Sequence, residues 1–221
     1  DHEILKEELR WKIQCEDTLW LIDKVIDGSN KQKPHDVYFP GDDLFTPFQR
    51  KKGLPIGNLT SQFWANVYMN RFDHFVKEEL GVKGYIRYVD DFVVFGKTRE
   101  QLKEWQVGIE RTLSKLRLIV HSNKTQIFPV EKGVPFLGFQ VFPHYKYVKK
   151  ANAKRHFRYL KKKLKDPELD ADGLQNSLNS WLGHIRFGQS QRREHTVFWY
   201  LKEQGVNLVK HPSGSWRVLE Q

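Results

Sequence analysis

Two adjacent carboxylates, Asp90 and Asp91, lie in the middle of an apolar and aromatic stretch that runs from residue 84 to residue 95. β-Branched and aromatic residues at this density favour strands, so the sequence predicts a β-hairpin with the two acids at its turn. Carboxylates this close repel one another unless a cation intervenes, and Mg²⁺ binds a few carboxylates together with substrate phosphates. The pattern indicates a metal-binding tip suited to phosphoryl transfer, with a merely solvated turn as the alternative.

A second candidate segment, residues 53–62, reads GLPIGNLTSQ. Gly53 and Gly57 allow the backbone to approach a ligand closely, and Pro55 stiffens the bend between them. The apolar spacing then predicts a helix from about residue 59 to residue 80, with its apolar stripe in the core. Ser61 and Gln62 fall in the first turn of that helix, where backbone N–H groups favour anions or polar ligands. The alternative for Ser61 is a simple helix cap.

These segments together resemble the motifs of reverse transcriptases. The sequence Tyr88-Val89-Asp90-Asp91 is similar to the catalytic box of that family, and residues 53–62 are similar to the box that precedes it. Many bacterial relatives have Gln-Gly and Ser-Pro in the latter box, whereas this chain has Ile-Gly and Ser-Gln, which resembles the enzymes of diversity-generating retroelements. The resemblance extends from residue 1 to about residue 200, through the FLG of residues 136–138 and the WLGHI of residues 181–185.

The resemblance implies a role for each matching residue. Asp90 and Asp91 would help to bind two Mg²⁺ ions, for which Mn²⁺ can substitute. Lys124 would act on the leaving pyrophosphate, where a cation neutralises developing charge, although a solvated lysine is the alternative. The residues beside the incoming nucleotide and the template would be Tyr88, Ile56, Gly57, Ser61 and Gln62. The primer grip would be Phe136, Leu137 and Gly138, with a β-bulge as the alternative reason for Gly138.

Ile56 is a candidate fidelity residue. It stands where many relatives have glutamine, and an apolar side chain cannot form the same hydrogen bonds. In the retroelement enzymes this change accompanies error-prone copying of template adenines, so the resemblance implies the same here. The alternative is that Ile56 serves only in packing.

The resemblance also leads us to expect an incomplete polymerase. In the family a further metal-binding aspartate ends a strand upstream of the segment that matches Asp1-His2, so Asp1 would be a later, noncatalytic aspartate. The fingers region and that upstream aspartate would be absent, and activity of this chain alone would be in doubt.

A run of positive charge lies between residues 149 and 165, which include nine Lys or Arg residues and no acid. Such a run is usually a solvated helix face, but in a polymerase-like chain it indicates contact with a phosphate backbone. The residues expected to make that contact are Lys149, Lys150, Lys154, Arg155, Arg158, Lys161 and Lys162.

The remaining elements follow from periodicity and turn residues. Two helices are predicted within residues 2–27, and a loop over residues 28–52, in which Asp42-Asp43 forms a turn and Arg50, Lys51 and Lys52 meet either phosphate or solvent. A helix capped by Thr98 is followed by a short strand from residue 118, strands at 127–128 and 136–141, and then helices to about residue 204, with the final residues left unassigned. This order predicts an α+β fold, with an antiparallel polymerase palm at residues 1–147 and a helical thumb at residues 148–221.

Composition narrows the function further. The net charge is +10, from 37 basic and 27 acidic residues, which suits a nucleic-acid partner. The single cysteine, Cys15, excludes an intrachain disulfide and a cysteine zinc site, and no apolar run is long enough to span a membrane. The resemblance to reverse transcriptases, with which this composition agrees, implies an RNA-directed DNA polymerase of the retroelement type, cytoplasmic, from a bacterium, archaeon or phage. Its partners would be template RNA, cDNA primer, deoxynucleoside triphosphates and a small basic oligomeric accessory protein. A retron or group II intron enzyme and a noncatalytic RNA-binding protein on a polymerase palm are the alternatives.

Overall fold

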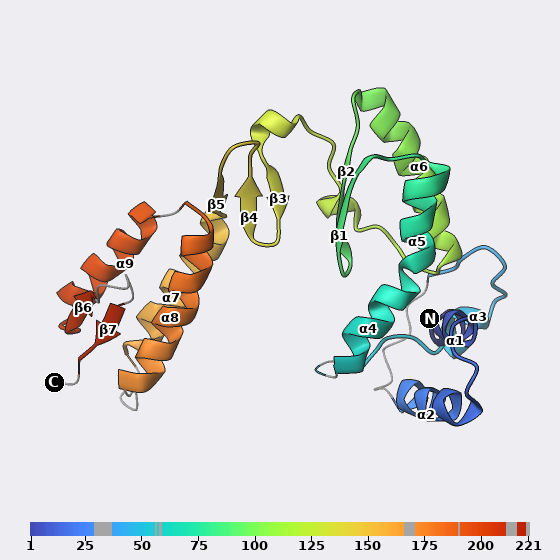
Figure 1. The fold of residues 1–221 in the computed structure, drawn as a ribbon, viewed down its shortest axis with the longest axis horizontal. Helices are drawn as coiled ribbons and strands as arrows, with labels where there is room; N and C mark the ends of the chain where they lie inside the picture. Colours follow the sequence, from blue (N-terminus) through green and yellow to red (C-terminus); the bar gives the residue numbers. More distant parts are fainter. Residues whose placement is uncertain are drawn as a thin grey trace. The chain divides into compact units, whose positions relative to one another are not determined.

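The computed structural model describes residues 1–28, 37–55, 57, 59–165, 171–189, 191–210 and 216–219. The chain forms two compact units, Asp1–Ile127 and Phe128–Gln221 (Figure 1). The sequence analysis placed the division between residues 147 and 148. The compact division falls earlier because the strands at 134–148 pack against the helices that follow them, as the contact of the Phe139 ring with His184 at 4.6 Å shows.

The first unit is built from helices around one β-hairpin. Its elements are α1 (His2–Arg10), α2 (Glu16–Asp27), α3 (Thr46–Gln49), α4 (Leu59–Tyr68), α5 (Asn70–His74) with a π-helical turn (Phe75–Glu79), β1 (Gly84–Tyr88), β2 (Asp91–Phe95), α6 (Arg99–Lys115) and a 3-10 turn (Ser122–Lys124). Thr98 caps α6 as predicted, because its side chain accepts a hydrogen bond from the Gln101 N–H at 3.2 Å.

The core of the first unit holds the hairpin against the helices. Phe72 of α5 is fully buried and meets the rings of Tyr85 and Phe92 edge-on, at 6.2 and 5.0 Å. Leu5 and Leu9 of α1 and Ile109 and Leu113 of α6 belong to the same core. Burial of this apolar surface is the main force that fixes the orientation of the hairpin in its unit.

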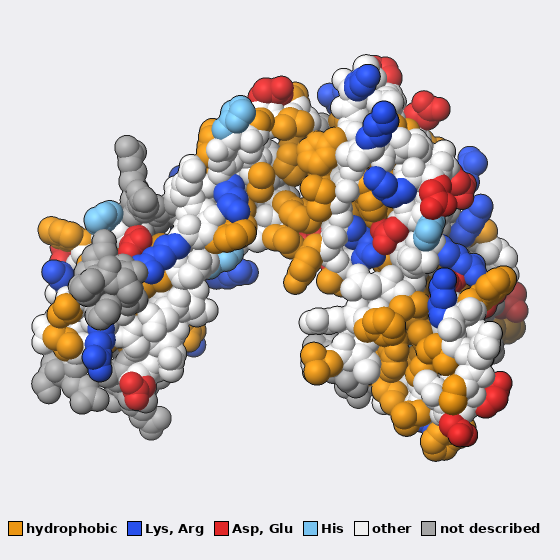
Figure 2. Space-filling view, in the orientation of Figure 1, with side chains coloured by type: hydrophobic (Ala, Val, Ile, Leu, Met, Phe, Trp, Pro, Cys, Tyr) orange, Lys and Arg blue, Asp and Glu red, His pale blue; other side chains and the backbone are white. Residues whose placement is uncertain are grey.

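The apolar stripe of α4 is only partly in the core. Trp64 and Tyr68 are buried as predicted, but Leu59 is 88% exposed and Phe63 is 59% exposed, so the prediction for the start of this helix was wrong. Figure 2 shows hydrophobic side chains gathered on the surface of the first unit where Figure 1 draws α4 and α2. Periodicity predicts which residues share a helix face but does not reveal whether another element covers the whole face.

A buried ionic network fixes the loop before the glycine segment. The Asp1 carboxylate, 2% exposed, accepts a hydrogen bond from Arg117 Nη1 at 2.7 Å and lies 3.4 Å from Arg50 Nε, and Arg50 also pairs with Asp42. The Arg50 bond and the backbone N–H of Phe39 hold the pKa of the Asp42 carboxyl below its usual value. Arg50 therefore meets neither phosphate nor solvent, whereas the turn predicted at Asp42-Asp43 is confirmed.

The second unit combines short antiparallel strands with three long helices. Its elements are a 3-10 turn (Val130–Lys132), β3 (Val134–Phe136), β4 (Phe139–Val141), β5 (Lys146–Val148), α7 (Lys150–Lys163), α8 (Ala171–Phe187), α9 (Gln191–Glu203), β6 (Leu208–Lys210) and β7 (Trp216–Val218). The face of α8 predicted to be apolar is buried in full, at Leu174, Leu178, Trp181, Leu182 and Ile185.

Three strand predictions are wrong. Residues 118–121 and 127–128 form no strand, and residues 136–141 are not one strand but the two arms of a tight hairpin, β3 and β4. Short apolar runs carry no information about their pairing partner, which is what decides whether they become strands.

Candidate functional site

The predicted hairpin is confirmed, and the two carboxylates lie at its tip. β1 and β2 pair antiparallel from Gly84 with Phe95 to Tyr88 with Asp91, which leaves Val89 and Asp90 as the two-residue turn. Val89 has φ +55°, which is unfavourable for a β-branched residue. Strain of this kind costs on the order of 1–3 kcal/mol and persists only where the surroundings impose it.

Arg87 is the residue that imposes the shape of this turn. Its Nη1 donates to the carbonyl of Val89 at 2.7 Å and to the Asn66 side chain at 3.0 Å. Its Nε and Nη2 bind the two oxygens of Asp73 on α5, at 2.7 and 2.5 Å, and Tyr85 Oη donates to the same carboxylate at 2.6 Å.

The hydrogen bonds from Arg87 and Tyr85 determine the pKa of Asp73. Burial raises the pKa of Asp73, but the bonds from Arg87 and Tyr85 outweigh burial and leave the pKa below its usual value. Sequence reasoning missed both Asp73 and Arg87. The signal for Arg87 was a cation inside an otherwise apolar strand, but nothing in the sequence pointed to Asp73, which lies on another element.

The Asp90 and Asp91 side chains are exposed, and neither bonds to any described residue. Their oxygens are therefore accessible to an external cation. Within the described residues no group of three or more His, Cys, Asp and Glu side chains could hold a metal ion. An adjacent carboxylate pair still fits Mg²⁺ as a partial ligand set, because this ion usually takes one or two protein carboxylates and completes its shell with water and phosphate oxygens. Tyr88, 59% exposed, flanks the pair.

The glycine segment is anchored to α1. The backbone N–H of His2 donates to the Lys51 carbonyl at 3.0 Å, and His2 Nε2 lies 2.7 Å from the carbonyl of Gly53. Gly53 and Gly57 have φ of +88° and +89°, so both positions need glycine for backbone reasons. Ile56 lies outside the described residues.

Ser61 and Gln62 lie in the first turn of α4, as predicted. Ser61 Oγ donates to the carbonyl of Pro55 at 2.6 Å and so closes the glycine segment onto the helix, which is not the N-cap role of the alternative. Gln62 is exposed. Lys124 is exposed at the end of its 3-10 turn, in the same unit as Asp90.

The predicted primer-grip residues form a second tight turn. Leu137 and Gly138 connect β3 to β4, with φ of +46° and +87°. Positive φ at both positions is the requirement of a type I′ turn, so the β-bulge alternative for Gly138 is wrong. The Gly138 carbonyl accepts hydrogen bonds from Lys149 N–H at 3.0 Å and from Asn152 Nδ2 at 3.3 Å. Sequence reasoning missed Asn152.

The predicted backbone-binding residues lie on α7 and its cap. Lys149 is the N-cap residue and is half-buried, whereas Lys150, Lys154, Arg155, Arg158, Lys161 and Lys162 are all exposed. Exposed basic side chains therefore lie on several sides of α7. In the part of the chain that the structure describes, no helix is long and apolar enough to cross a membrane.

These features define a protein of mixed α and β structure, with small antiparallel sheets and an exposed carboxylate pair on a strained hairpin. A family model described as "Reverse transcriptase (RNA-dependent DNA polymerase)" matches residues 3–141. The chain belongs to the reverse transcriptase family. A comparison with curated proteins gives no match.

Proposed function

We propose that this protein is the template-copying DNA polymerase of a diversity-generating retroelement. The reaction is attack of a primer 3′-hydroxyl on the α-phosphorus of a deoxynucleoside triphosphate, directed by an RNA template. The observation that carries the proposal is the hairpin tip, where two exposed carboxylates without any described partner stand on a turn held by Arg87.

In this proposal Asp90 and Asp91 would help to hold two divalent cations, Mg²⁺ or Mn²⁺, and such ions would supply activation of the attacking oxygen and charge neutralisation at the phosphate. The other residues of the proposed site bind the nucleotide, the template, the primer and the phosphate backbone. Tyr88, Gly57, Ser61 and Gln62 border the nucleotide and the template, and Lys124 provides positive charge for the leaving pyrophosphate. Phe136, Leu137 and Gly138 hold the primer end, and α7 binds the phosphate backbone.

The retroelement assignment rests on Ile56 and on the Ser61-Gln62 pair. A side chain without hydrogen-bonding groups at residue 56 supports relaxed selection opposite template adenine. A retron or group II intron enzyme remains the alternative within the family. A palm at residues 1–147, a thumb at residues 148–221, and a small basic accessory protein as partner belong to the same proposal.

The test is primer extension on an RNA template with Mg²⁺, using the full-length protein and its Asp90→Ala variant. We expect extension by the wild type, loss of extension by at least about a thousandfold in the variant, and RNA affinity within a few fold. Equal extension by both proteins contradicts the assignment of Asp90. RNA binding without extension by either protein favours the alternative of a noncatalytic RNA-binding protein.

The fidelity part of the proposal needs its own measurement. We expect Ile56→Gln to reduce misincorporation opposite template adenines relative to the other three template bases, with overall extension retained. Sequencing of the products from one template measures both quantities. An unchanged error spectrum means that Ile56 serves in packing and removes the main support for the retroelement type.

A further inference from the structure

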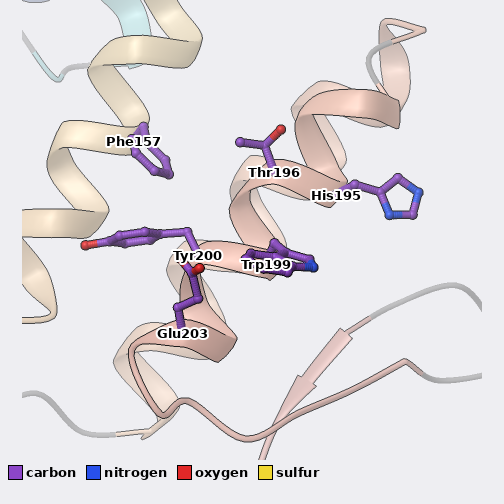
Figure 3. A pocket seen from close by; sticks show the side chains of 6 residues that line it. All are labelled: Phe157, His195, Thr196, Trp199, Tyr200 and Glu203. Atoms are coloured by element: carbon purple, nitrogen blue, oxygen red, sulfur yellow. The ribbon is translucent and has the colours of Figure 1, made fainter.

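We infer that the second unit carries a binding site for an unpaired nucleobase of RNA, between α7 and α9. The site is a pocket of about 490 Å³ lined by Phe157 of α7 and by His195, Thr196, Trp199, Tyr200 and Glu203 of α9 (Figure 3). The inference rests on the proposed function insofar as it takes RNA to be the bound polymer. It adds a base-binding site to a helix whose expected role was contact with phosphates alone.

Aromatic side chains form the walls of the pocket. Phe157 and Tyr200 point toward one another across the gap between the helices, with ring centroids 4.9 Å apart and planes at 59° (Figure 3). Trp199, next along α9, is 70% exposed. Every base has a π face, and stacking on an exposed aromatic ring strengthens single-strand binding by roughly tenfold or more per base.

Positive charge lies along one edge of the pocket. Lys161 Nζ is 5.0 Å from the ring centroids of both Phe157 and Tyr200. Lys154, Arg158 and Lys161 are all exposed. They are spaced four and three residues apart on α7, so they form one stripe along the helix, which we call the basic stripe, about 10 Å long.

Glu203 makes the pocket unfavourable for the phosphate of a nucleotide and favourable for its base. Glu203 would repel a phosphate, but its carboxylate can accept hydrogen bonds from the amino groups of a base edge. The phosphates therefore belong on the basic stripe and the base belongs in the pocket. A paired base offers neither its faces nor its hydrogen-bonding edge, so a duplex can use the stripe but not the pocket.

The charge of α7 favours RNA over a protein as the occupant. Between Lys150 and Lys163 the helix has seven basic residues and no acidic one. A protein partner would need an acidic surface matched to the stripe together with an apolar group for the pocket. An RNA strand has both kinds of group in every nucleotide.

The experiment measures affinity of the full-length protein for three probes, an unstructured single-stranded RNA, the same RNA with abasic sites throughout, and an RNA duplex. We expect Trp199→Ala to weaken binding of the single strand about tenfold, and to change the affinity for the abasic and duplex probes less than twofold. Trp199→Phe keeps a stacking face and should stay within about threefold of the wild type. Trp20→Ala is the matched control, because Trp20 is 62% exposed on α2 of the other unit.

A second variant tests the basic stripe without touching Trp199. Lys161→Gln should weaken all three probes and lower the slope of log affinity against log salt concentration by about one unit. Unchanged single-strand affinity in Trp199→Ala overturns the inference, as does an equal loss on the abasic probe. Loss of an interaction with a protein partner, with all RNA affinities unchanged, would reassign the pocket to that partner.

Primer extension by the same preparations separates this inference from the proposed function. Base-dependent binding through Trp199 without any extension by the wild type contradicts the proposed function alone. Extension with no dependence of single-strand affinity on Trp199 contradicts the inference alone. Because Trp199 is exposed, Trp199→Ala should leave the melting temperature unchanged. If Trp199→Ala lowers the melting temperature, the RNA affinities of Trp199→Phe are used in its place.

Discussion

The β1–β2 and β3–β4 hairpins both have a two-residue turn with a bulky residue at positive φ, but different groups stabilise the two turns. Each turn places a bulky residue at positive φ, Val89 in β1–β2 and Leu137 in β3–β4, where an asparagine or a glycine would be easier. In the first turn the carbonyl of Val89 accepts a hydrogen bond from the Arg87 side chain, and the two carboxylates at the tip have no partner among the described residues. The second turn includes a glycine and is held through its own carbonyl by Lys149 and Asn152.

The difference indicates what each tip offers to a ligand. The first tip presents negative charge that no described residue neutralises. The second tip presents Leu137, an apolar side chain that is 42% exposed, and has no charge to neutralise. In the proposed function the first tip binds metal ions and the second contacts a sugar or a base.

Truncation of one residue at each tip gives the largest expected contrast. Asp90→Ala removes a metal ligand and should abolish primer extension, whereas Leu137→Ala removes only apolar contact area and should lower kcat by roughly threefold to tenfold. Steady-state extension on one RNA template measures both. Comparable losses in the two variants would remove the functional distinction between the tips.

Arg87→Lys tests whether the first turn depends on its support. A lysine retains the charge but cannot bind Asp73 with two parallel bonds and reach the Val89 carbonyl as well. Relaxation of Val89 would displace Asp90 by about 1 Å, and a displacement of that size costs about a hundredfold in rate. We expect kcat to fall by that order with RNA affinity within threefold.

The control for Arg87 is another arginine on the surface of the same unit. Arg10 pairs with Asp23 at 2.6 Å on the solvent side of α1 and α2. Arg10→Lys should leave kcat within twofold. Wild-type kcat in Arg87→Lys would mean that the strained turn does not require this side chain.

Gly138→Ala tests the support of the second turn. A Cβ at this residue would lie 2.8 Å from Asn152 Nδ2, and φ is +87°, so the substitution adds strain and displaces the asparagine. We expect kcat to fall about tenfold, and Asn152→Ala to have a smaller effect in the same direction. Gly205→Ala, also at positive φ but with nothing within 4 Å of the added Cβ, is the control for strain alone.

The sequence predicted the parts of the site whose signal is local. The hairpin with Asp90 and Asp91 at its tip, the Thr98 cap and the buried face of α8 all follow from residue types at fixed spacing. The residues that hold the two turns were missed. Asp73 lies 14 residues from Arg87, and Asn152 lies 14 residues from Gly138, so each partnership appears only when separate elements pack together.

The burial errors have the same origin. Arg50 was expected to meet either phosphate or solvent, but it pairs with the carboxylates of Asp1 and Asp42 in the fold. Leu59 and Phe63 looked like core, but no described element covers them. A single sequence shows which side chains share a face and leaves open what packs against that face.

Low pH should destabilise the packing of α7 against α8, the helices that support the second turn. This is the smallest effect we expect. His156 of α7 stacks on Trp181 of α8 at 4.8 Å, and its Nε2 is buried without a hydrogen-bond partner among the described residues. Burial, with a smaller contribution from the nearby His184, lowers the pKa of His156 from 6.5 to about 4. Because the folded pKa lies below the unfolded one, the neutral ring contributes stability that is complete above pH 6.5 and is lost as pH falls toward 4.

The loss is about 1 kcal/mol once screening of a half-buried ring is allowed for. This loss of stability affects α7 and α8, which also pack against Gly138. Asn152 of α7 bonds the Gly138 carbonyl, and a Cβ at Gly138 would lie 3.6 Å from the His184 ring of α8. Melting temperature measured between pH 7 and pH 4 should decline in the wild type and stay flatter in His156→Phe, which keeps the stacking ring and cannot be protonated. His184→Gln retains His156 and should retain most of the decline. Parallel curves for the wild type and His156→Phe would show that the acid sensitivity arises elsewhere and that this helix pair supports the second turn independently of pH.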